Sequence, residues 1–170
     1  SEFANAQSVN FDTDPFGNPI PSGSFITTQY ESLGLVMNNF QVSDNVYGGP
    51  ASAPNTTITP IVPGEALEFQ FVVPVRAVGF INTSPDQDGI EFLDSEGAVI
   101  FSIRDQDDQP GPNFNIDRFL GVVADPARPI RSVRVINADP NGSGRLELDE
   151  LIFVPVEATY EYQVEAIDPD

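Results

Sequence analysis

The sequence predicts an all-β protein with the fold of an antiparallel β-sandwich of the jelly-roll type. Apolar and polar residues alternate with a period of two in many short runs, and no stretch of ten or more residues has the 3.6-residue period of an amphipathic helix. Turn-forming residues separate these runs about every 8–12 residues, as in β-sandwiches. No internal repeat of about 20–50 residues is evident, which argues against a propeller or a solenoid.

Composition limits the chemistry available to the chain. It has no cysteine and no histidine, which removes disulfides, thiolate metal sites and the usual general base of hydrolytic triads. Carboxylates and carbonyls remain as metal ligands, and these suit calcium. The net charge of −19 would repel nucleic acid and anionic membranes. No apolar run approaches the roughly 20 residues of a membrane span, so no membrane insertion is expected.

We expect one domain over residues 1–170, at a length that supports a sizeable core. Residues 1–8 are expected to form a flexible N-terminus, in which residues 1–3 resemble a cloning remnant. Residues 157–170 alternate as a strand does and are expected to form an edge strand or a linker. The acidic composition without any lysine is typical of a secreted or cell-surface protein in a salty or calcium-rich medium.

The first half of the chain predicts short β-rich runs separated by turns. The expected strands are residues 9–12, 24–30, 33–37, 65–73 and 75–82. One helical turn around residues 29–33 is the only helix expected. Residues 40–60 are rich in Asn, Gly, Pro, Ser and Thr and predict the longest loop, and long loops on a rigid sandwich often carry function.

The second half predicts a meander of hairpins. The expected strands are residues 75–82, 90–93, 98–103 and 114–123, followed by a hairpin over residues 133–154. In that hairpin two alternating runs flank a loop of turn formers, Asp139 to Gly144. Asp149 shares its parity with Leu151 and Phe153, which predicts that its carboxylate points into the core and needs a partner there.

The loop from Asp139 to Glu150 fits the spacing of an EF-hand calcium loop. An EF-hand requires a helix on each side, whereas both flanks here have β periodicity. An ordinary hairpin turn is therefore the default interpretation, with calcium binding in another geometry as the alternative. Two further acidic loops, residues 86–88 and 105–108, could also hold calcium, although such runs are more often solvated turns.

The segment Glu147-Leu148-Asp149-Glu150 is similar to the Glu-x-Asp core of laminarinase-type glycosidases, which are jelly rolls. Retaining hydrolysis needs two carboxyl groups about 5–5.5 Å apart, which Glu147 and Asp149 could satisfy. The third acidic residue of that core is replaced here by an apolar one, and the chain has no tryptophan to line a sugar cleft. A glycoside hydrolase is therefore ranked third, after the two functional hypotheses given below.

Five motifs occur in order along nearly the whole chain. They are Phe11-Asp12, Ile26-x-x-x-Tyr30-x-x-x-Gly34, Val75-x-Ala77-Val78-Gly79-Phe80, Phe119-Leu120-Gly121-Val122 and Leu148-Asp149-Glu150-Leu151-Ile152-Phe153. Together they resemble jelly-roll domains of secreted and surface-anchored bacterial proteins, including those with PEP-CTERM sorting signals. They are distantly similar to calcium-containing carbohydrate-binding modules.

The resemblance implies a structural calcium ion that joins the first strand to the last. The matching positions are Asp12, Asp149 and Glu150. Two inward carboxylates brought together would repel unless a proton or a cation lies between them, which agrees with that inference. In the alternative, Asp12 caps a turn and Asp149 pairs with an arginine such as Arg145.

The resemblance also implies a non-catalytic extracellular module, a monomer or a part of a larger protein, that binds polysaccharide or a cell-surface glycan. Stacking on a sugar ring would use Tyr47, Tyr160, Tyr162 or an exposed phenylalanine. The rival hypothesis is a structural or adhesive spacer of a bacterial surface or matrix protein, stabilised by calcium and without a sugar site. An exposed row of aromatic residues would favour the first hypothesis.

Overall fold

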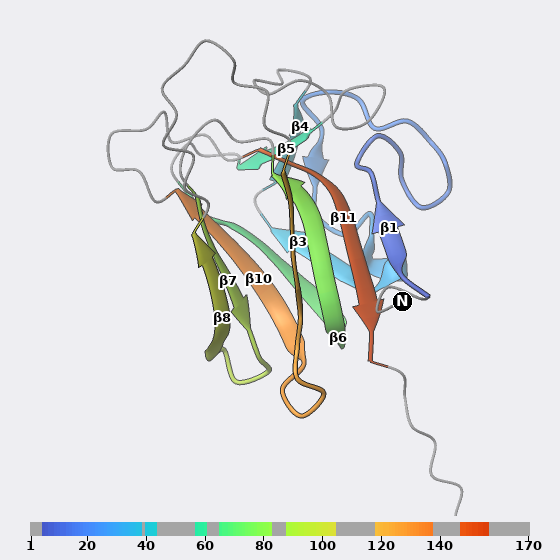
Figure 1. The fold of residues 1–170 in the computed structure, drawn as a ribbon. Helices are drawn as coiled ribbons and strands as arrows, with labels where there is room; N and C mark the ends of the chain where they lie inside the picture. The colour runs from blue at the N-terminus through green and yellow to red at the C-terminus, as the bar shows by residue number, and fades with distance from the viewer. Residues whose placement is uncertain are drawn as a thin grey trace, which may run out of the picture.

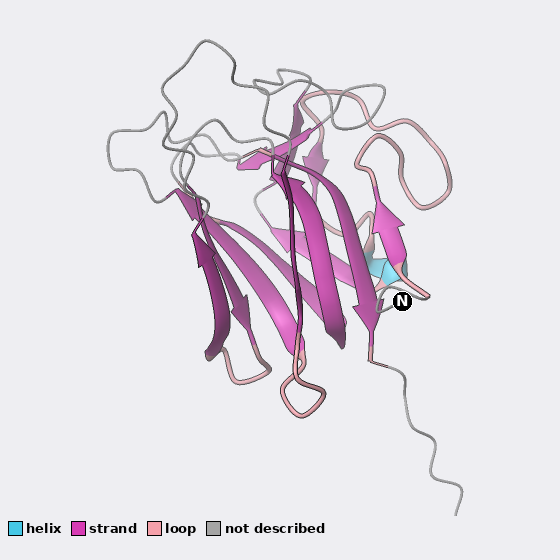
Figure 2. Ribbon diagram, in the orientation of Figure 1, coloured by secondary structure: helices cyan, strands magenta, loops and turns pink. Residues whose placement is uncertain are grey.

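The computed structural model describes residues 5–38, 40–43, 57–60, 65–82, 88–104, 118–137 and 147–156. Nearly all regular structure in this part of the chain is β, and the expected helical turn is confirmed as the 3-10 helix Glu31–Leu33 (Figure 2). The strands are β1 (Gln7–Val9), β2 (Phe25–Ile26), β3 (Leu35–Asn38), β4 (Phe40–Ser43), β5 (Thr57–Pro60), β6 (Leu67–Asn82), β7 (Asp88–Leu93), β8 (Val99–Arg104), β9 (Arg118–Val123), β10 (Ile130–Asn137) and β11 (Leu148–Pro155).

Strand β6 builds the sandwich because it folds back on itself. Figure 1 shows it as two green legs that meet at the lower end of the molecule. The rings of Phe69 and Phe80, one from each leg, have centroids 6.1 Å apart. A straight strand would separate these residues by about 36 Å, at roughly 3.3 Å per residue. Alternation of exposed and buried residues breaks at the bend, where Val72 and Val73 are both exposed before Pro74.

The two legs of β6 belong to opposite sheets. Residues 67–71 pair with β3 and β10, whereas residues 77–82 pair with β9 and β11. One sheet therefore has the order β3-β6-β10-β7-β8, and the other has the order β9-β6-β11-β1, with β5, β4 and β2 added beyond β11. All pairings are antiparallel. From β8 to β11 the chain alternates between the two sheets, and the predicted antiparallel sandwich is confirmed.

The core lies between the two sheets and is rich in phenylalanine. Phe69 also packs against Phe40 and Phe71, and Phe71 packs against Phe153 at 5.1 Å between ring centroids. These contacts link β4, both legs of β6 and β11. The two sheets therefore share a continuous cluster of aromatic side chains at their centre.

The predicted hairpin over residues 133–154 is wrong. Its two strands form, as β10 and β11, but both edges of β10 are occupied by β6 and β7. Strand β11 instead pairs with β6, β5 and β1 in the other sheet. Residues 138–146, which include every EF-hand-like position except Glu150, lie outside the described residues.

Two other local predictions also differ from the structure. The expected loop over residues 40–60 begins with β4 and ends with β5, which pair with one another. The run at residues 75–82 does not form a hairpin with β7, because β7 pairs with β10 and β8. The hairpin of β7 with β8 is confirmed. Within the described ranges no helix is long and apolar enough to cross a membrane.

Candidate functional site

Three of the residues predicted to bind sugar fall outside the part of the chain that the structure describes. Tyr47, Tyr160 and Tyr162 all lie in undescribed segments, as do the acidic loop 105–108 and most of the acidic loop 86–88. Their roles remain predictions from sequence.

The candidate metal residues come from two adjacent strands. Strand β1 pairs with β11 so that Val9 lies opposite Leu151. Asp12 follows Val9 by three residues and Asp149 precedes Leu151 by two, so both lie beyond the same end of this pairing. Both are buried, with 5% and 1% of their surface exposed. The fold thus brings the first strand beside the last, with Asp12 three residues after β1 and Asp149 near the start of β11.

A β-bulge interrupts β11 next to Asp149. Asp149 lies opposite Ile81 of β6 and Ile152 lies opposite Gly79, so three steps along β11 match two along β6. The extra residue is at Glu150, whose φ of 47° lies in the left-handed region. The backbone N–H of Glu150 donates a 2.7 Å hydrogen bond to Oδ1 of Asp149.

The bulge changes which face of the sheet Asp149 occupies. Phe80 belongs to the core, so its neighbour Ile81, and Asp149 opposite Ile81, lie on the other face. Leu151 and Phe153, beyond the bulge, are core residues. The prediction that Asp149 is buried is confirmed, but the shared parity with Leu151 and Phe153 that led to it is wrong.

Asp12 lies close to the phenol of Tyr30. The Tyr30 hydroxyl donates a 2.8 Å hydrogen bond to the carbonyl oxygen of Thr13, and its ring packs edge-on against Phe11. Burial raises the pKa of Tyr30, and the negative charges of Asp12 and Asp14 raise it further. The phenol therefore stays protonated and fixes the chain that follows β1 to the segment before helix Glu31–Leu33.

Calcium takes six to eight oxygen ligands. Among the described residues, no group of three acidic side chains is placed to hold a metal ion. A calcium site among these residues would therefore also need oxygens other than those of acidic side chains. Asp12 and Asp149 could supply part of one, with further oxygens from elsewhere in the chain.

A second site lies next to this buried region, at a surface hollow of about 490 Å³. It is formed by the turn after β1 and the segment around helix Glu31–Leu33, and we call it the Phe16 hollow. Its described lining residues are Asp14, Phe16, Thr28, Gln29, Glu31 and Ser32. Phe16 is 83% exposed, an unusual state for a large apolar side chain, and large exposed apolar groups often mark binding surfaces.

The turn that carries Phe16 is held by hydrogen bonds. Oδ1 of Asp14 accepts from the backbone N–H groups of Phe16, at 2.8 Å, and of Asn18, at 2.9 Å. Oδ2 accepts from the Asn18 side chain at 2.8 Å. The hydrogen bonds from Asn18, and those from the backbone of Phe16 and Gly17, lower the pKa of Asp14 and keep its carboxylate ionised. Gly17 supplies the positive φ of 83° that the turn requires.

The opposite wall of the hollow is polar and also locally fixed. Gln29 accepts from the backbone N–H of Thr27 at 2.6 Å and donates to the carbonyl of Phe25 at 2.8 Å, so its amide holds the wall in place. No hydrogen bond of the Thr28, Glu31 or Ser32 side chain to another described residue is found. Their oxygens therefore line the hollow as hydrogen-bonding groups beside an apolar ring.

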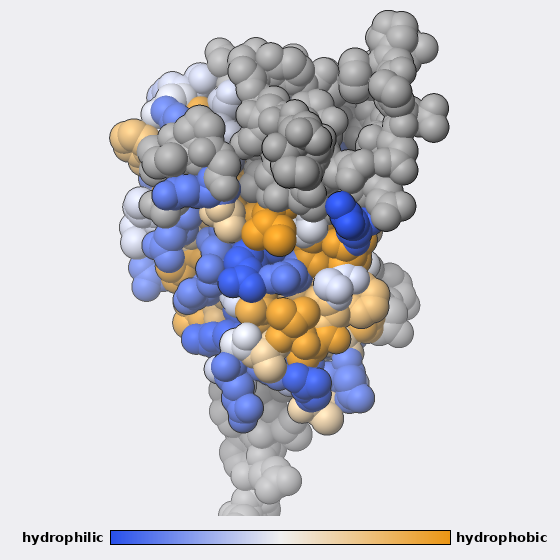
Figure 3. Space-filling model, turned by 90° about the vertical axis from the view of Figure 1, so that its left-hand side faces the viewer, coloured by the Kyte–Doolittle hydropathy of each residue, from blue (hydrophilic) through white to orange (hydrophobic). Residues whose placement is uncertain are grey.

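A different cleft, of about 310 Å³, lies between the edge strands β8 and β9. Its lining is mainly apolar, namely Ile100, Phe101, Val122, Val123, Ala124 and Ile130, with Asp125 and Arg128. Figure 3 shows the side of the molecule on which β7 and β8 lie, where apolar residues gather at the centre among hydrophilic ones. We call this the β8–β9 cleft.

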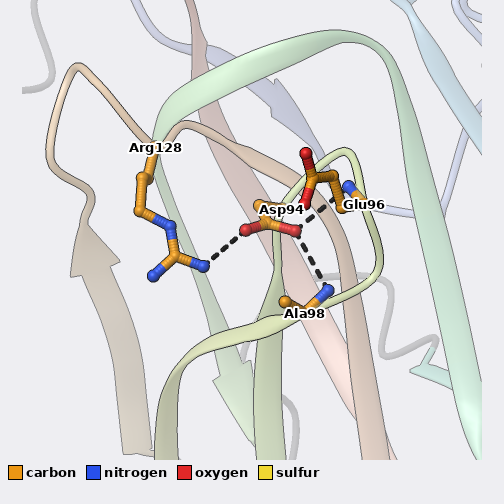
Figure 4. Close-up of polar contacts among 4 residues, drawn as sticks. All are labelled: Asp94, Glu96, Ala98 and Arg128. Carbon is orange, nitrogen blue, oxygen red and sulfur yellow. Dashed lines mark hydrogen bonds and ion pairs between the residues drawn. The ribbon is translucent and has the colours of Figure 1, made fainter.

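The charged groups of the β8–β9 cleft have local partners. Arg128 pairs with Asp94 at 2.5 Å, and Asp94 also accepts from the backbone N–H groups of Glu96, at 3.1 Å, and Ala98, at 3.0 Å (Figure 4). Asp125 accepts from the backbone N–H of Ala127 at 2.9 Å. The hydrogen bond from Arg128 lowers the pKa of Asp94 the most. This cleft therefore presents mainly apolar surface to a ligand, and its charged side chains already have hydrogen-bond or ion-pair partners in the protein.

The other exposed phenylalanines on these strands pack against the protein. Phe101 contacts Phe92, with ring centroids 6.2 Å apart. Phe119 lies over Gly79 and Gly121, since a Cβ added at Gly79 would be 2.3 Å from its Cζ. Glycine at these positions thus leaves room for the ring on the sheet. Phe16 differs from both because it projects from a turn.

The Phe16 hollow was not predicted from sequence, although a signal for it exists. In Asp14-Pro15-Phe16-Gly17 the turn formers enclose a single aromatic residue, and a turn tip with no apolar neighbour at strand spacing is exposed. The sequence analysis allowed for an exposed phenylalanine in a sugar site but did not identify Phe16 as that residue.

Comparison with known proteins gives distant likenesses only. No family model matches the chain, and no curated protein matches it. The catalytic domain of a GH87 alpha-1,3-glucanase in complex with nigerose is 13% identical with a TM-score of 0.44, over 97% of this chain and 31% of that one. A mutant of CBM29-2, from the family 29 carbohydrate-binding modules, is 15% identical with a TM-score of 0.41, over 88% and 91%. This chain spans under a third of the glucanase domain. Because both of these TM-scores are below 0.5, the function proposed next rests on the chain's own fold and site.

Proposed function

We propose that this protein is a non-catalytic carbohydrate-binding module that holds a polysaccharide in the Phe16 hollow. One observation carries the proposal: a solvent-exposed phenyl ring on a hydrogen-bonded turn faces a wall of hydroxyl, amide and carboxylate groups. A sugar ring has the matching character, with C–H groups on its faces and hydroxyls on its rim. Binding sites of this kind combine apolar contact with a few placed polar groups.

The β8–β9 cleft matches a sugar less well. A bound sugar would place hydroxyl groups against its apolar lining, and hydroxyls buried without hydrogen bonds cost about 1–3 kcal/mol each. The side chains of Asp125 and Arg128, which could satisfy them, already have partners. We therefore assign the sugar to the Phe16 hollow.

The burial of the glycosidase-like carboxylates favours the non-catalytic role. Glu147 and Asp149 are 3% and 1% exposed. A catalytic acid and nucleophile must contact the substrate, and the nucleophile must later be reached by water. Burial of both side chains therefore supports a structural role rather than that of a catalytic pair. An extracellular location suits a module for polysaccharide, and we include it in the proposal.

We further propose that calcium stabilises the fold near Asp12 and Asp149, with Glu150 as the third candidate ligand. Support comes from the burial of the two aspartates beyond one end of the β1 and β11 pairing. The ion would link the first strand to the last and add to the protein contacts of the two buried carboxylates.

A panel of soluble polysaccharides in affinity gels tests the sugar site. At least one neutral glycan should retard the wild-type protein. Phe16→Ala should weaken that interaction by roughly ten- to a hundredfold, because burying a phenylalanine is worth about 1.5–3 kcal/mol and 1.4 kcal/mol is tenfold in affinity.

Phe101→Ala is the matched control, because it removes a half-exposed phenyl group from the β8–β9 cleft. It should leave retardation unchanged. Loss of retardation in Phe101→Ala but not in Phe16→Ala would move the site to that cleft. A protein that no polysaccharide retards would instead match the structural or adhesive spacer.

A further inference from the structure

The described residues that line the Phe16 hollow belong to the first 75 residues of the chain, which contain no Lys or Arg. The first basic residue in the sequence is Arg76, so the segments that form the hollow contain none. Among its described lining residues, Asp14 and Glu31 are acidic and none is basic. The net charge of −19 adds a negative field around the whole molecule. Among the described residues that line the hollow, a ligand therefore meets fixed negative charge and no basic side chain.

The two carboxylates of the hollow have different roles. Asp14 accepts three hydrogen bonds within its own turn, so its charge is fixed and its oxygens are largely committed. Glu31 stands in the first turn of helix Glu31–Leu33, and its side chain makes no hydrogen bond to another described residue. Glu31 is thus the carboxylate that can accept hydrogen bonds from a ligand.

Asp14 and Glu31 line the same hollow, so both carboxylates act on a ligand that enters it. A ligand carboxylate there would face repulsion that water screens only in part.

We propose that the Phe16 hollow selects its polysaccharide by charge, accepting neutral and amine-bearing sugars and rejecting uronate polymers, with Glu31 as the residue that sets this preference. The inference rests on the proposed sugar site and adds the class of ligand. An ammonium group on a sugar would pair with Glu31 while the ring covers Phe16. A sugar carboxylate in the same position would meet like charges.

Three soluble polymers of one backbone test this proposal: a neutral glucan, the same glucan partly carboxymethylated, and the same backbone with free amines. Dissociation constants are measured for each at about 0.1 M salt, where the Debye length is about 10 Å. The neutral polymer should bind at least about tenfold more tightly than the carboxymethylated one. The amine polymer should bind at least as tightly as the neutral one.

Glu31→Gln distinguishes the effect of the charge in the hollow from the effect of the protein's net charge. It should reduce the discrimination against carboxymethyl groups several-fold and remove the advantage of the amine polymer. Glu96→Gln makes the same charge change in the exposed turn between β7 and β8 and should alter neither. Equal effects of the two variants would show that bulk charge alone sets the preference and would overturn the proposal.

Two other outcomes distinguish this inference from the function on which it rests. If none of the polymers binds in a manner that Phe16→Ala weakens, the sugar site itself is wrong and the charge preference falls with it. If the carboxymethylated polymer binds as tightly as the neutral one and Phe16→Ala weakens both, the sugar site stands and the charge preference is overturned.

Discussion

At the scale of single residues, one turn occurs twice in this protein. Asp14 and Asp94 each accept hydrogen bonds from the backbone N–H groups two and four residues later. Each is followed three residues later by a glycine with positive φ, Gly17 at 83° and Gly97 at 78°. The first turn presents Phe16 to solvent, whereas the second joins β7 to β8. The same pattern of hydrogen bonds therefore holds the turn that carries Phe16 in one place and closes the β7–β8 hairpin in the other.

This repetition gives a matched pair of variants. Asp14→Ala removes the acceptors that fix Phe16, and ordering a free side chain on binding costs about 0.5–1.5 kcal/mol, or roughly two- to twelvefold in affinity. Asp94→Ala removes the equivalent acceptor from the other turn, together with the ion pair to Arg128, and should leave polysaccharide affinity unchanged. Titration calorimetry of both variants measures the difference. Equal affinities in Asp14→Ala and the wild type would show that the turn does not preorganise Phe16.

At the scale of elements, β6 determines the architecture because its two legs supply neighbouring strands to both sheets. The fold back at Pro74 places Phe69 and Phe80 in contact across the core. Residues eleven apart on a straight strand could not interact, since about 36 Å would separate them. The contact is therefore specific to the folded-back geometry.

A double-mutant cycle measures that contact. Phe69→Leu and Phe80→Leu should each destabilise the protein, and the double variant should lose less than the sum of the two. The coupling expected for an edge-on aromatic pair is about 0.5–1.5 kcal/mol beyond the area each ring buries. Urea unfolding of the four proteins gives the value. Strict additivity would mean that the two legs do not face one another.

Sequence alternation predicted both legs of β6, because a strand with one buried face shows that face in its pattern. It did not predict which strands pair. The alternation at Val133 and Val135 is the same whether β10 has β11 or β7 as its neighbour, so the expected hairpin was wrong. The bulge at Glu150 could not be predicted either, because the pattern of polar and apolar residues does not show that a non-glycine residue has a positive φ. The burial of Asp149 could be predicted from the sequence, whereas the face of the sheet on which it lies could not.

At the scale of the whole molecule, the net charge of −19 predicts that bound cations increase the stability of the fold. A calcium ion bound only by the native state adds about 2.7 kcal/mol at a hundredfold excess over its Kd. For a chain of this size, that corresponds to a rise of roughly 5–10 °C in Tm, at about 2–4 °C per kcal/mol. Chelation should therefore lower Tm by this amount, and Asp149→Asn should reduce the difference.

Sodium chloride at equal ionic strength controls for screening of the net charge. Magnesium is a second control, because it requires a tighter octahedral shell and loses water reluctantly. A Tm that is the same with chelator and with calcium would show that protein groups alone satisfy Asp12 and Asp149.

The location of a bound sugar tests whether the Phe16 hollow is the binding site. An oligosaccharide of a retained polysaccharide is titrated into isotopically labelled protein, and backbone amide chemical shifts are followed by NMR. The largest changes should fall at Phe16 and its turn, residues 14–18, and at residues 28–32 across the hollow. Changes centred on residues 100–101 and 122–125 would place the ligand in the β8–β9 cleft and contradict the account.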